Sequence, residues 1–196
     1  MTPSTVAAAI LRGGRARRFG GRDKGRLIVE GRSIIVRQLE VLQRVAGEVF
    51  LVGRRADDDP ADAGALPVFD DRIPGAGALG GIYTALEVAH GDPVLVVACD
   101  LPFLDEALLG ALVERSAGAD AAWVRSDRGP EPLLACYRRS ARTPVRAAIQ
   151  AGRLKAGDLG AVLRIAEIDA EALARFGPPA RLLANVNTPD DYARIR

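Results

Sequence analysis

Short apolar runs recur along the chain and alternate with stretches in which apolar residues return at helical spacing. The first run, Val6–Leu11, predicts a strand that enters a buried sheet. Further runs, bounded by Gly, Pro or charged residues, predict more short strands of the same kind. The predicted strands are Val6–Leu11, Val49–Val52, Pro67–Phe69, Val94–Ala98, Ala121–Val124, Leu133–Tyr137, Val162–Ile168 and Leu182–Val186.

Helical patterns lie between the predicted strands. Ile35, Leu39 and Leu42 mark one buried face of a helix that Ser33 can cap. The segment Thr188–Asp191 combines a capping residue, a proline at the first helical position and acids in the first turn. The alternation predicts an α/β fold, a three-layer sandwich around a mainly parallel central sheet, as a single domain over residues 1–196. Helices are predicted to begin near Ile34, Leu79, Asp105, Ser140, Glu171 and Pro189.

The segment Arg12–Lys24 is the most informative part of the sequence. It follows the first predicted strand, is rich in Gly and Arg, and closes on a lone lysine. Residues 12–26 include seven basic residues and one acid. Glycines let the backbone aim several N–H groups at one point, which is the geometry that cradles phosphate oxygens. A Walker loop is excluded, because Asp23 and Gly25 flank the lysine where that motif needs Gly and then Ser or Thr.

Several polar residues follow the ends of predicted strands. Ligands of open α/β sheets bind at the carboxyl ends of strands, so one wall of one cleft can hold the Arg12 loop, Asp71, Asp100 and Asn185. Asp100 comes after the buried run Val94–Ala98, where a carboxylate can bind a Mg²⁺ ion that also bridges substrate phosphates. The alternative for Asp100 is a turn or helix cap.

Other candidate groups are basic or amide side chains. Lys24 can stabilise the charge that develops when a nucleotidyl group leaves pyrophosphate, and Arg18 can grip a phosphate with its bidentate fork. Both can instead be solvated surface residues. Asn185 and Asn187 alternate around Val186, so a strand would point both amides the same way, toward a heterocycle or a phosphate. The alternative for the pair is capping of a strand end.

Composition narrows the class of ligand. The net charge is only +2 and aromatic residues make up 5% of the chain, which argues against a nucleic acid partner. Residues 12–26 sum to +6, whereas residues 54–92 hold eight acids against three basic residues, a balance that suits a small phosphorylated ligand with a divalent cation. No signal peptide or membrane-spanning run is visible, so a cytoplasmic protein is expected, with Cys99 and Cys136 as buried free thiols.

Five segments in order resemble those of a known family. The segment Leu11–Gly25 is similar to the signature of nucleotide-sugar-type nucleotidyltransferases, and most similar to that of the molybdenum cofactor guanylyltransferases, MobA-like enzymes that join GMP to molybdopterin. The resemblance runs from about Ala9 to about Tyr192. The other matching segments are Asp71–Gly77, Leu79–Ile82, Cys99–Leu104 and Asn185–Pro189.

The resemblance implies a Rossmann-like nucleotidyltransferase fold and a Mg²⁺-dependent transfer of GMP from GTP to the terminal phosphate of molybdopterin. It implies catalytic roles for Lys24, Arg18 and Asp100, with Asp100 as the metal ligand, and acceptor binding by Asn185 and Asn187. A monomer is favoured, with cofactor-insertion or delivery proteins as further partners. The nucleotide-binding residues that it implies are Leu11, Arg12, Gly13, Gly14, Lys24, Asp71 and Asp100.

The chain departs from the family pattern at positions that bear on the nucleotide base. Arg12 stands where relatives usually have alanine, Ala78 replaces the usual proline, and Val52 stands where some relatives offer an asparagine. A cytidylyltransferase, or a transferase with another phosphorylated acceptor, therefore remains an alternative. From other classes, a non-catalytic nucleotide-binding regulator and an oxidoreductase that binds a dinucleotide through Gly75–Gly80 also remain.

Overall fold

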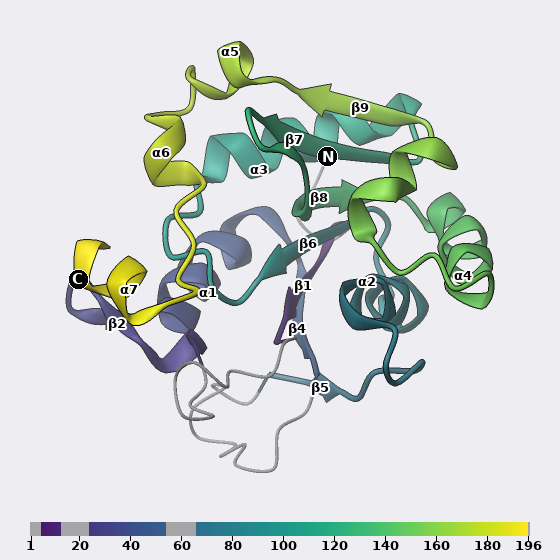
Figure 1. Cartoon of the computed structure of the whole chain (residues 1–196), viewed down its shortest axis with the longest axis horizontal. Helices are drawn as coiled ribbons and strands as arrows, with labels where there is room; N and C mark the ends of the chain where they lie inside the picture. Colours follow the sequence, from purple (N-terminus) through teal and green to yellow (C-terminus); the bar gives the residue numbers. More distant parts are fainter. Residues whose placement is uncertain (1–4, 13–23, 54–65, 196) are drawn as a thin grey trace.

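A seven-stranded sheet forms the centre of the molecule (Figure 1). The computed structural model describes residues 5–12, 24–53 and 66–195. The strands follow one another across the sheet in the order β5-β4-β1-β6-β8-β7-β9. Their bounds are β1 Ala7–Leu11, β4 Glu48–Val52, β5 Val68–Phe69, β6 Val94–Ala98, β7 Ala121–Ser126, β8 Gly129–Tyr137 and β9 Ile165–Ile168.

All neighbouring strands are parallel except at β8, which runs antiparallel to both β6 and β7. The carboxyl ends of β5, β4, β1 and β6 therefore lie along one edge of the sheet, beside the amino end of β8. Strand β1 occupies the middle of the parallel part, with Leu11 opposite Val52 of β4 on one side and Ala98 of β6 on the other. The predicted mainly parallel sheet is confirmed.

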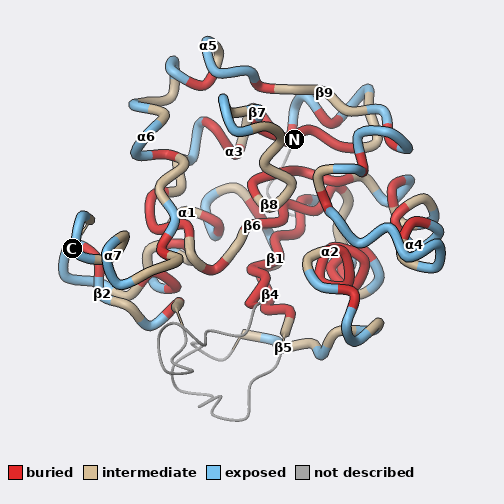
Figure 2. The backbone as a smooth tube through the Cα atoms, in the orientation of Figure 1, coloured by how far each residue is buried: buried red, intermediate tan, exposed pale blue. Residues whose placement is uncertain are grey.

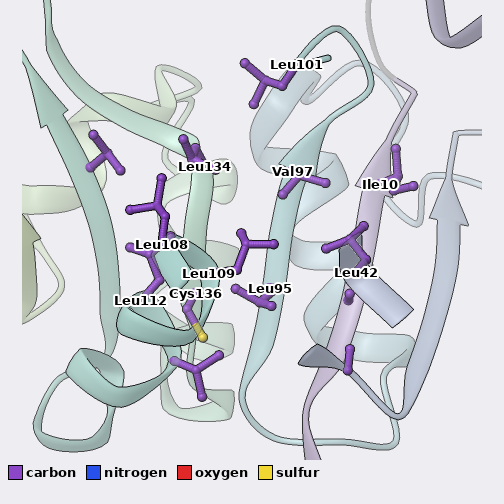
Figure 3. Packing of buried hydrophobic residues seen from close by; sticks show 14 of the residues in the cluster. Ile10, Leu42, Leu95, Val97, Leu101, Leu108, Leu109, Leu112, Leu134 and Cys136 are labelled. Carbon is purple, nitrogen blue, oxygen red and sulfur yellow. The ribbon is translucent and has the colours of Figure 1, made fainter. Parts of the chain in front are cut away.

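Helices cover both faces of the sheet, so the predicted three-layer sandwich is confirmed. The helices α1 (Ile34–Val45) and α3 (Glu106–Arg115) pack on one face. Ser33 caps α1 by accepting a hydrogen bond from the Val36 N–H, and Asp105 caps α3 in the same way. Figure 3 shows the apolar cluster that these helices form with the sheet, which includes Ile10, Leu42, Leu95, Val97, Leu108, Leu109, Leu112 and Cys136.

The opposite face is covered by α2 (Gly77–Val88) and α4 (Arg142–Gln150). Successive residues of β1 alternate between the two clusters, with Ile10 in the first and Leu11 in the second. Both faces of β1 are consequently buried, as Figure 2 shows for the middle of the sheet. Within the described parts of the chain, no helix is both long enough and apolar enough to cross a bilayer.

The C-terminal part differs from the sequence prediction. The predicted strand Leu182–Val186 is wrong, because Leu182 ends a short helix, α6 (Pro179–Leu182), and the residues after it join no sheet. Proline at the first helical position favours the start of α6 at Pro179. The apolar run that had predicted a strand is divided between the end of this helix and the segment after it. Leu182 packs in the α1–α3 cluster, whereas Val186 packs in a small separate one.

Smaller differences concern the edges of elements. Helix α2 begins at Gly77, two positions before the predicted start, and β9 is shorter than the predicted strand because a 3₁₀ helix, η6 (Ala156–Ala161), comes before it. The short hairpin formed by β2 and β3 was not predicted from the sequence. The remaining elements are η3 Lys24–Arg26, β2 Ile28–Val29, β3 Arg32–Ser33, η4 Ser116–Gly118, η5 Arg139–Ala141, α5 Ala170–Leu173 and α7 Pro189–Ile195.

Candidate active site

A pocket of about 490 Å³ lies along the edge of the sheet where the parallel strands end. Its wall follows the sheet order, from Asp71 after β5, past Gly53 after β4 and Leu11 of β1, to Asp100 after β6 and Glu131 of β8. Asn185, from the segment between α6 and α7, completes the wall. The pocket is therefore at the place that the strand-end argument predicted, with Asp100 between Leu11 and Glu131 in the order of the strands.

Lys24 begins η3 and directs its ammonium group at two acceptors from distant parts of the chain. Its Nζ atom lies 3.0 Å from Oδ2 of Asp100 and 2.6 Å from Oδ1 of Asn187. The side chains of Lys24 and Asp100 are 16% and 19% exposed, so the pair is largely shielded yet still reachable. A lysine held in this way is a fixed positive charge next to a carboxylate just after the carboxyl end of β6, where it can contact a phosphate.

The turn that carries Asp100 is held from three sides. From β1, the Leu11 carbonyl accepts a hydrogen bond from the Cys99 N–H. From the C-terminal segment, the Val186 N–H donates to the Asp100 carbonyl at 3.0 Å. From α1, the Gln38 amide donates to two carbonyls of the turn. These backbone contacts fix the path of the turn, so the Asp100 carboxylate has a defined position without a strand or helix of its own.

Gln38 of α1 is a fully buried polar residue. Its Nε2 atom donates to the carbonyl oxygens of Ala98 and Leu101, each at 2.8 Å, so it bridges the two sides of the Asp100 turn. Its Oε1 atom has no hydrogen-bond partner among the described residues. A buried polar side chain is retained at a cost in free energy unless its hydrogen bonds offset that cost. Sequence reasoning missed this residue, although a glutamine within the apolar face of a helix is the signal that could have found it.

The two C-terminal asparagines do not share one environment. Asn185 lies on the pocket wall, whereas Asn187 contacts Lys24. The strand on which the predicted alternation of the two amides rested is absent, because this segment joins no sheet. It is held by Val186, which packs against Val29, Ile34 and Phe103.

The predicted cap of the last helix is present. Thr188 Oγ1 accepts a hydrogen bond from the Asp191 N–H, and the Asp191 carboxylate accepts from the N–H groups of Asn187 and Thr188. This reciprocal pair is a capping box, which fixes the angle at which the chain enters α7. The Tyr192 hydroxyl donates to the Ile28 carbonyl and so ties α7 to the hairpin beside η3. The cap thereby holds Asn187 close to Lys24.

Asp71 lies at the opposite end of the pocket from Glu131. Burial, assisted by the neighbouring charge of Asp70, raises the pKa of the Asp71 carboxyl above its ordinary value. A carboxylate that loses hydration on burial gains most from a ligand that donates N–H groups to it. Asp71 is consequently suited to a heterocycle with N–H donors, in keeping with its predicted nucleotide-binding role.

The start of the glycine-rich segment is described only as far as Arg12. Its N–H donates to the Val52 carbonyl at 2.8 Å, and the Leu11 carbonyl already accepts from Cys99. These two backbone groups take part in the sheet, and the Leu11 carbonyl oxygen keeps a second lone pair with which it can accept from a ligand. Gly13, Gly14 and Arg18, which were predicted to bind the nucleotide or act in catalysis, lie outside the described residues.

The glycines of α2 let the helix approach the sheet closely. A Cβ atom on Gly81 would lie 2.9 Å from Cδ1 of Leu11, and one on Gly80 would lie 3.0 Å from the Ile73 carbonyl oxygen. This packing places the start of α2 over the pocket. The dinucleotide motif Gly75–Gly80 does not fit this arrangement, because residues 70–74 separate it from β5 and the motif should open directly after a strand.

Asp100 is the described residue that best suits a divalent cation. Among the residues that the structure describes, no three His, Cys, Asp or Glu side chains gather into a cage for an ion. Mg²⁺ does not need such a cage, since it keeps several waters and commonly binds one or two carboxylates together with substrate phosphates. The single carboxylate of Asp100 at the pocket therefore fits Mg²⁺ better than it fits zinc or calcium.

Comparison with known proteins agrees with the fold. A family model described as the MobA-like NTP transferase domain matches residues 8–167. The chain is 37% identical to a probable molybdenum cofactor guanylyltransferase of Chloroflexus aggregans, covering 97% of this chain and 93% of that protein. It is 30% identical to a molybdenum cofactor guanylyltransferase of Shewanella sp. strain MR-4, with coverage of 97% and 94%.

Solved structures define the class of protein. Molybdopterin-guanine dinucleotide biosynthesis protein A from Archaeoglobus fulgidus matches this chain with a TM-score of 0.78 at 30% identity, over 96% of each chain. A 2-C-methyl-D-erythritol 4-phosphate cytidylyltransferase from Thermus thermophilus, at 18% identity and a TM-score of 0.64, shares the fold. The fold is thus that of the nucleotidyltransferases. Within that class, the chain belongs to the MobA-like NTP transferase family.

Proposed function

We propose that this protein transfers GMP from GTP to the terminal phosphate of molybdopterin, releasing pyrophosphate and forming a molybdopterin guanine dinucleotide. The observation that carries the proposal is the convergence of Lys24, Asp100 and Asn187 beside one pocket. The names of relatives, molybdenum cofactor guanylyltransferase at 30% identity or more over nearly the whole chain, support the same reaction.

The reaction requires stabilisation of negative charge more than it requires proton transfer. A phosphate oxygen of the acceptor attacks the α-phosphorus of GTP in line, and the bond from that phosphorus to the pyrophosphate oxygen breaks. The acceptor is already an anion at neutral pH, so no strong general base is required. Negative charge grows on the α-phosphoryl oxygens and on the leaving group, where the fixed ammonium of Lys24 stabilises it. The rate enhancement comes mainly from positioning the two substrates and from neutralising the charge of the phosphates.

Asp100 is the residue that would hold Mg²⁺ in this proposal. When bound, the ion would neutralise phosphate charge and help to orient the triphosphate. Lys24 lies 3.0 Å from the same carboxylate, so a cation, a lysine and substrate phosphates would share one small region. This arrangement would balance opposite charges, since the Lys24 ammonium and the ion would offset the charges of the carboxylate and the phosphates.

We expect the reaction to take place in the cytoplasm. Cys99 and Cys136 are both buried and form no disulfide, which suits a reducing compartment. Burial raises the pKa of the Cys136 thiol to about 12, so it stays protonated and inert at neutral pH.

The test is a turnover assay with purified protein, GTP, molybdopterin and Mg²⁺. Pyrophosphate release and a dinucleotide product detected by mass spectrometry are expected. A parallel assay with CTP addresses the cytidylyl alternative, which the departures at Arg12 and Val52 keep open. A ratio of kcat/KM that favours GTP supports the proposal; one that favours CTP moves the chain to the cytidylyl branch. Absence of pyrophosphate with both nucleotides would contradict the proposed function.

A further inference from the structure

Strand β8 carries a large irregularity where it borders the pocket. Along β7, Trp123 and Val124 are consecutive, but their partners on β8 are Ala135 and Glu131. Pro132, Leu133 and Leu134 therefore have no partner on β7, and the strand bulges at these residues. Bulges re-aim side chains and are common next to active sites. The bulge places Glu131 and the three residues after it on the pocket wall.

The bulge is held in place by a buried tyrosine. The Tyr137 hydroxyl donates to the Pro132 carbonyl at 2.8 Å, and the Tyr137 side chain is fully buried. Prolines on both sides of Glu131 lack N–H groups, so the backbone at these two positions cannot donate a hydrogen bond to a neighbouring strand. The shape of this end of the pocket is consequently a fixed feature of the fold.

Glu131 is the one carboxylate on the bulge, and it is oriented without being neutralised. The Ser126 hydroxyl donates to its Oε1 atom at 2.8 Å. Within the described part of the chain, Glu131 takes part in no ion pair, and the nearby Arg125 is engaged by Glu167 at 2.6 Å instead. A partly buried carboxylate with one hydroxyl partner retains the capacity to accept further hydrogen bonds from a ligand.

The surroundings of Glu131 suit a flat heterocycle. Pro132, Leu133 and Leu183 give this end of the pocket apolar walls, and Asn185 adds one amide. Asp71 lies at the other end, beyond β6 and β1 in the sheet order, and Asp100 lies between the two. The pocket thus has two ends, each with a carboxylate, on either side of the residue proposed to hold the metal.

We infer that Glu131 binds the amino-pyrimidinone edge of the acceptor's pterin ring, an inference that rests on the proposed function. A pterin presents a ring N–H and an exocyclic NH₂ side by side, and a carboxylate can accept a hydrogen bond from each with its two oxygens. The apolar walls of the bulge cover the ring faces. Guanine presents the same edge, and Asp71 is the carboxylate placed to accept from it on the nucleotide side. Glu131 is therefore a specificity-determining residue for the acceptor.

The test compares E131Q with the parent enzyme in the GTP and molybdopterin assay. Glutamine keeps the shape but removes one acceptor oxygen and the charge. We expect KM for molybdopterin to rise by about 10- to 100-fold, which corresponds to the loss of one well-placed buried hydrogen bond to a charged group. KM for GTP should stay within about twofold of the parent value. E114Q, which changes an exposed glutamate on α3, is the matched control and should leave both KM values unchanged.

A second variant keeps the test independent of folding. E131D retains the charge but shortens the side chain, so its KM for molybdopterin should fall between those of the parent and E131Q. Unchanged KM for molybdopterin in a folded E131Q would overturn the inference, and so would a rise confined to GTP, which would assign Glu131 to the guanine. If the parent itself releases no pyrophosphate, the proposed function fails first, and that result is distinct from either of these.

Discussion

The Nζ atom of Lys24 lies 2.6 Å from Oδ1 of Asn187, although 163 positions separate the two residues in the chain. The same Nζ atom lies 3.0 Å from Oδ2 of Asp100. Asn187 is thus a neighbour of the lysine, whereas Asn185 lines the pocket. The C-terminal segment therefore contributes two amides to the site, one that contacts Lys24 and one that lines the pocket.

Replacement of Lys24 by alanine should reduce turnover by roughly 100-fold or more, because it removes one preorganised positive group from the developing charge. The fold should persist, since Lys24 lies at the pocket and not in either core cluster. Steady-state pyrophosphate release measures the effect. Lys155→Ala is the control, because Lys155 is the only other lysine and its side chain is 81% exposed. Parental turnover in a folded Lys24→Ala variant would remove the assigned role.

Asp100→Asn should shift the dependence of turnover on Mg²⁺ to higher concentration and lower the maximal rate. The substitution keeps the size of the side chain but removes the anionic ligand that Mg²⁺ prefers. A Mg²⁺ titration of initial rates measures both quantities. Asp127→Asn, at an exposed position between β7 and β8, is the control. A variant with the parent's midpoint and maximal rate would place the metal at another residue.

Replacement of the two asparagines should change different kinetic constants. Asn185→Ala should raise KM for molybdopterin, because Asn185 lines the pocket in which the acceptor is proposed to bind. Asn187→Ala should chiefly lower kcat, because it removes one of the two groups that hold the Lys24 ammonium. Each lost hydrogen bond would cost about 1–3 kcal/mol in the free energy of acceptor binding or of activation. Equal changes in KM for both variants would show that the asparagines act together on the acceptor, as strand alternation had predicted.

Gln38→Leu should lower both stability and turnover. It removes the buried donor of the Ala98 and Leu101 carbonyls. The Ala98 carbonyl keeps the hydrogen bond from the Leu101 N–H, so the expected cost is about 1–3 kcal/mol for the Leu101 carbonyl. The substitution also releases the turn that carries Asp100, so the Mg²⁺ midpoint should rise even where the variant is fully folded. Denaturant unfolding and a Mg²⁺ titration test the two parts. Gln43→Leu changes an exposed glutamine on the same helix and should move neither.

Asp120 should make stability depend on acid pH. Hydrogen bonds from Arg164 and Ser140 lower the pKa of the Asp120 carboxyl to about 2 in the folded state, against about 3.9 in an unfolded chain. The lowered value means that the stabilisation is complete above about pH 4 and is lost as pH falls toward 2. Asp120→Asn should therefore cost about 1 kcal/mol at pH 7 and nearly nothing at pH 2.

Urea unfolding of the parent and of Asp120→Asn at pH 7, 4 and 2.5 measures this difference. Asp190→Asn, at an exposed position in α7, is the control. A difference between parent and Asp120→Asn that stays constant over this pH range would contradict the assignment.

Local patterns in the sequence were sufficient for most of the fold. The runs that became β1, β4 and β6 are apolar on both faces, and such runs are stable only inside a covered parallel sheet. Caps at Ser33, Asp105 and Thr188 act within four residues of themselves, so their helices could be predicted from neighbours alone. The strand-end position of Asp100 follows from the same local information.

Only the tertiary structure decided which distant groups meet. The sequence placed Asn185 and Asn187 on one strand, but burial of Val186 against Phe103 and the bond from its N–H to the Asp100 carbonyl gave the segment a different path. Glu131 entered the site because a bulge, held by Tyr137, turned β8 toward the pocket. Periodicity reports the neighbours of a residue along one element, whereas these contacts depend on how separate elements pack against each other, which no local pattern encodes.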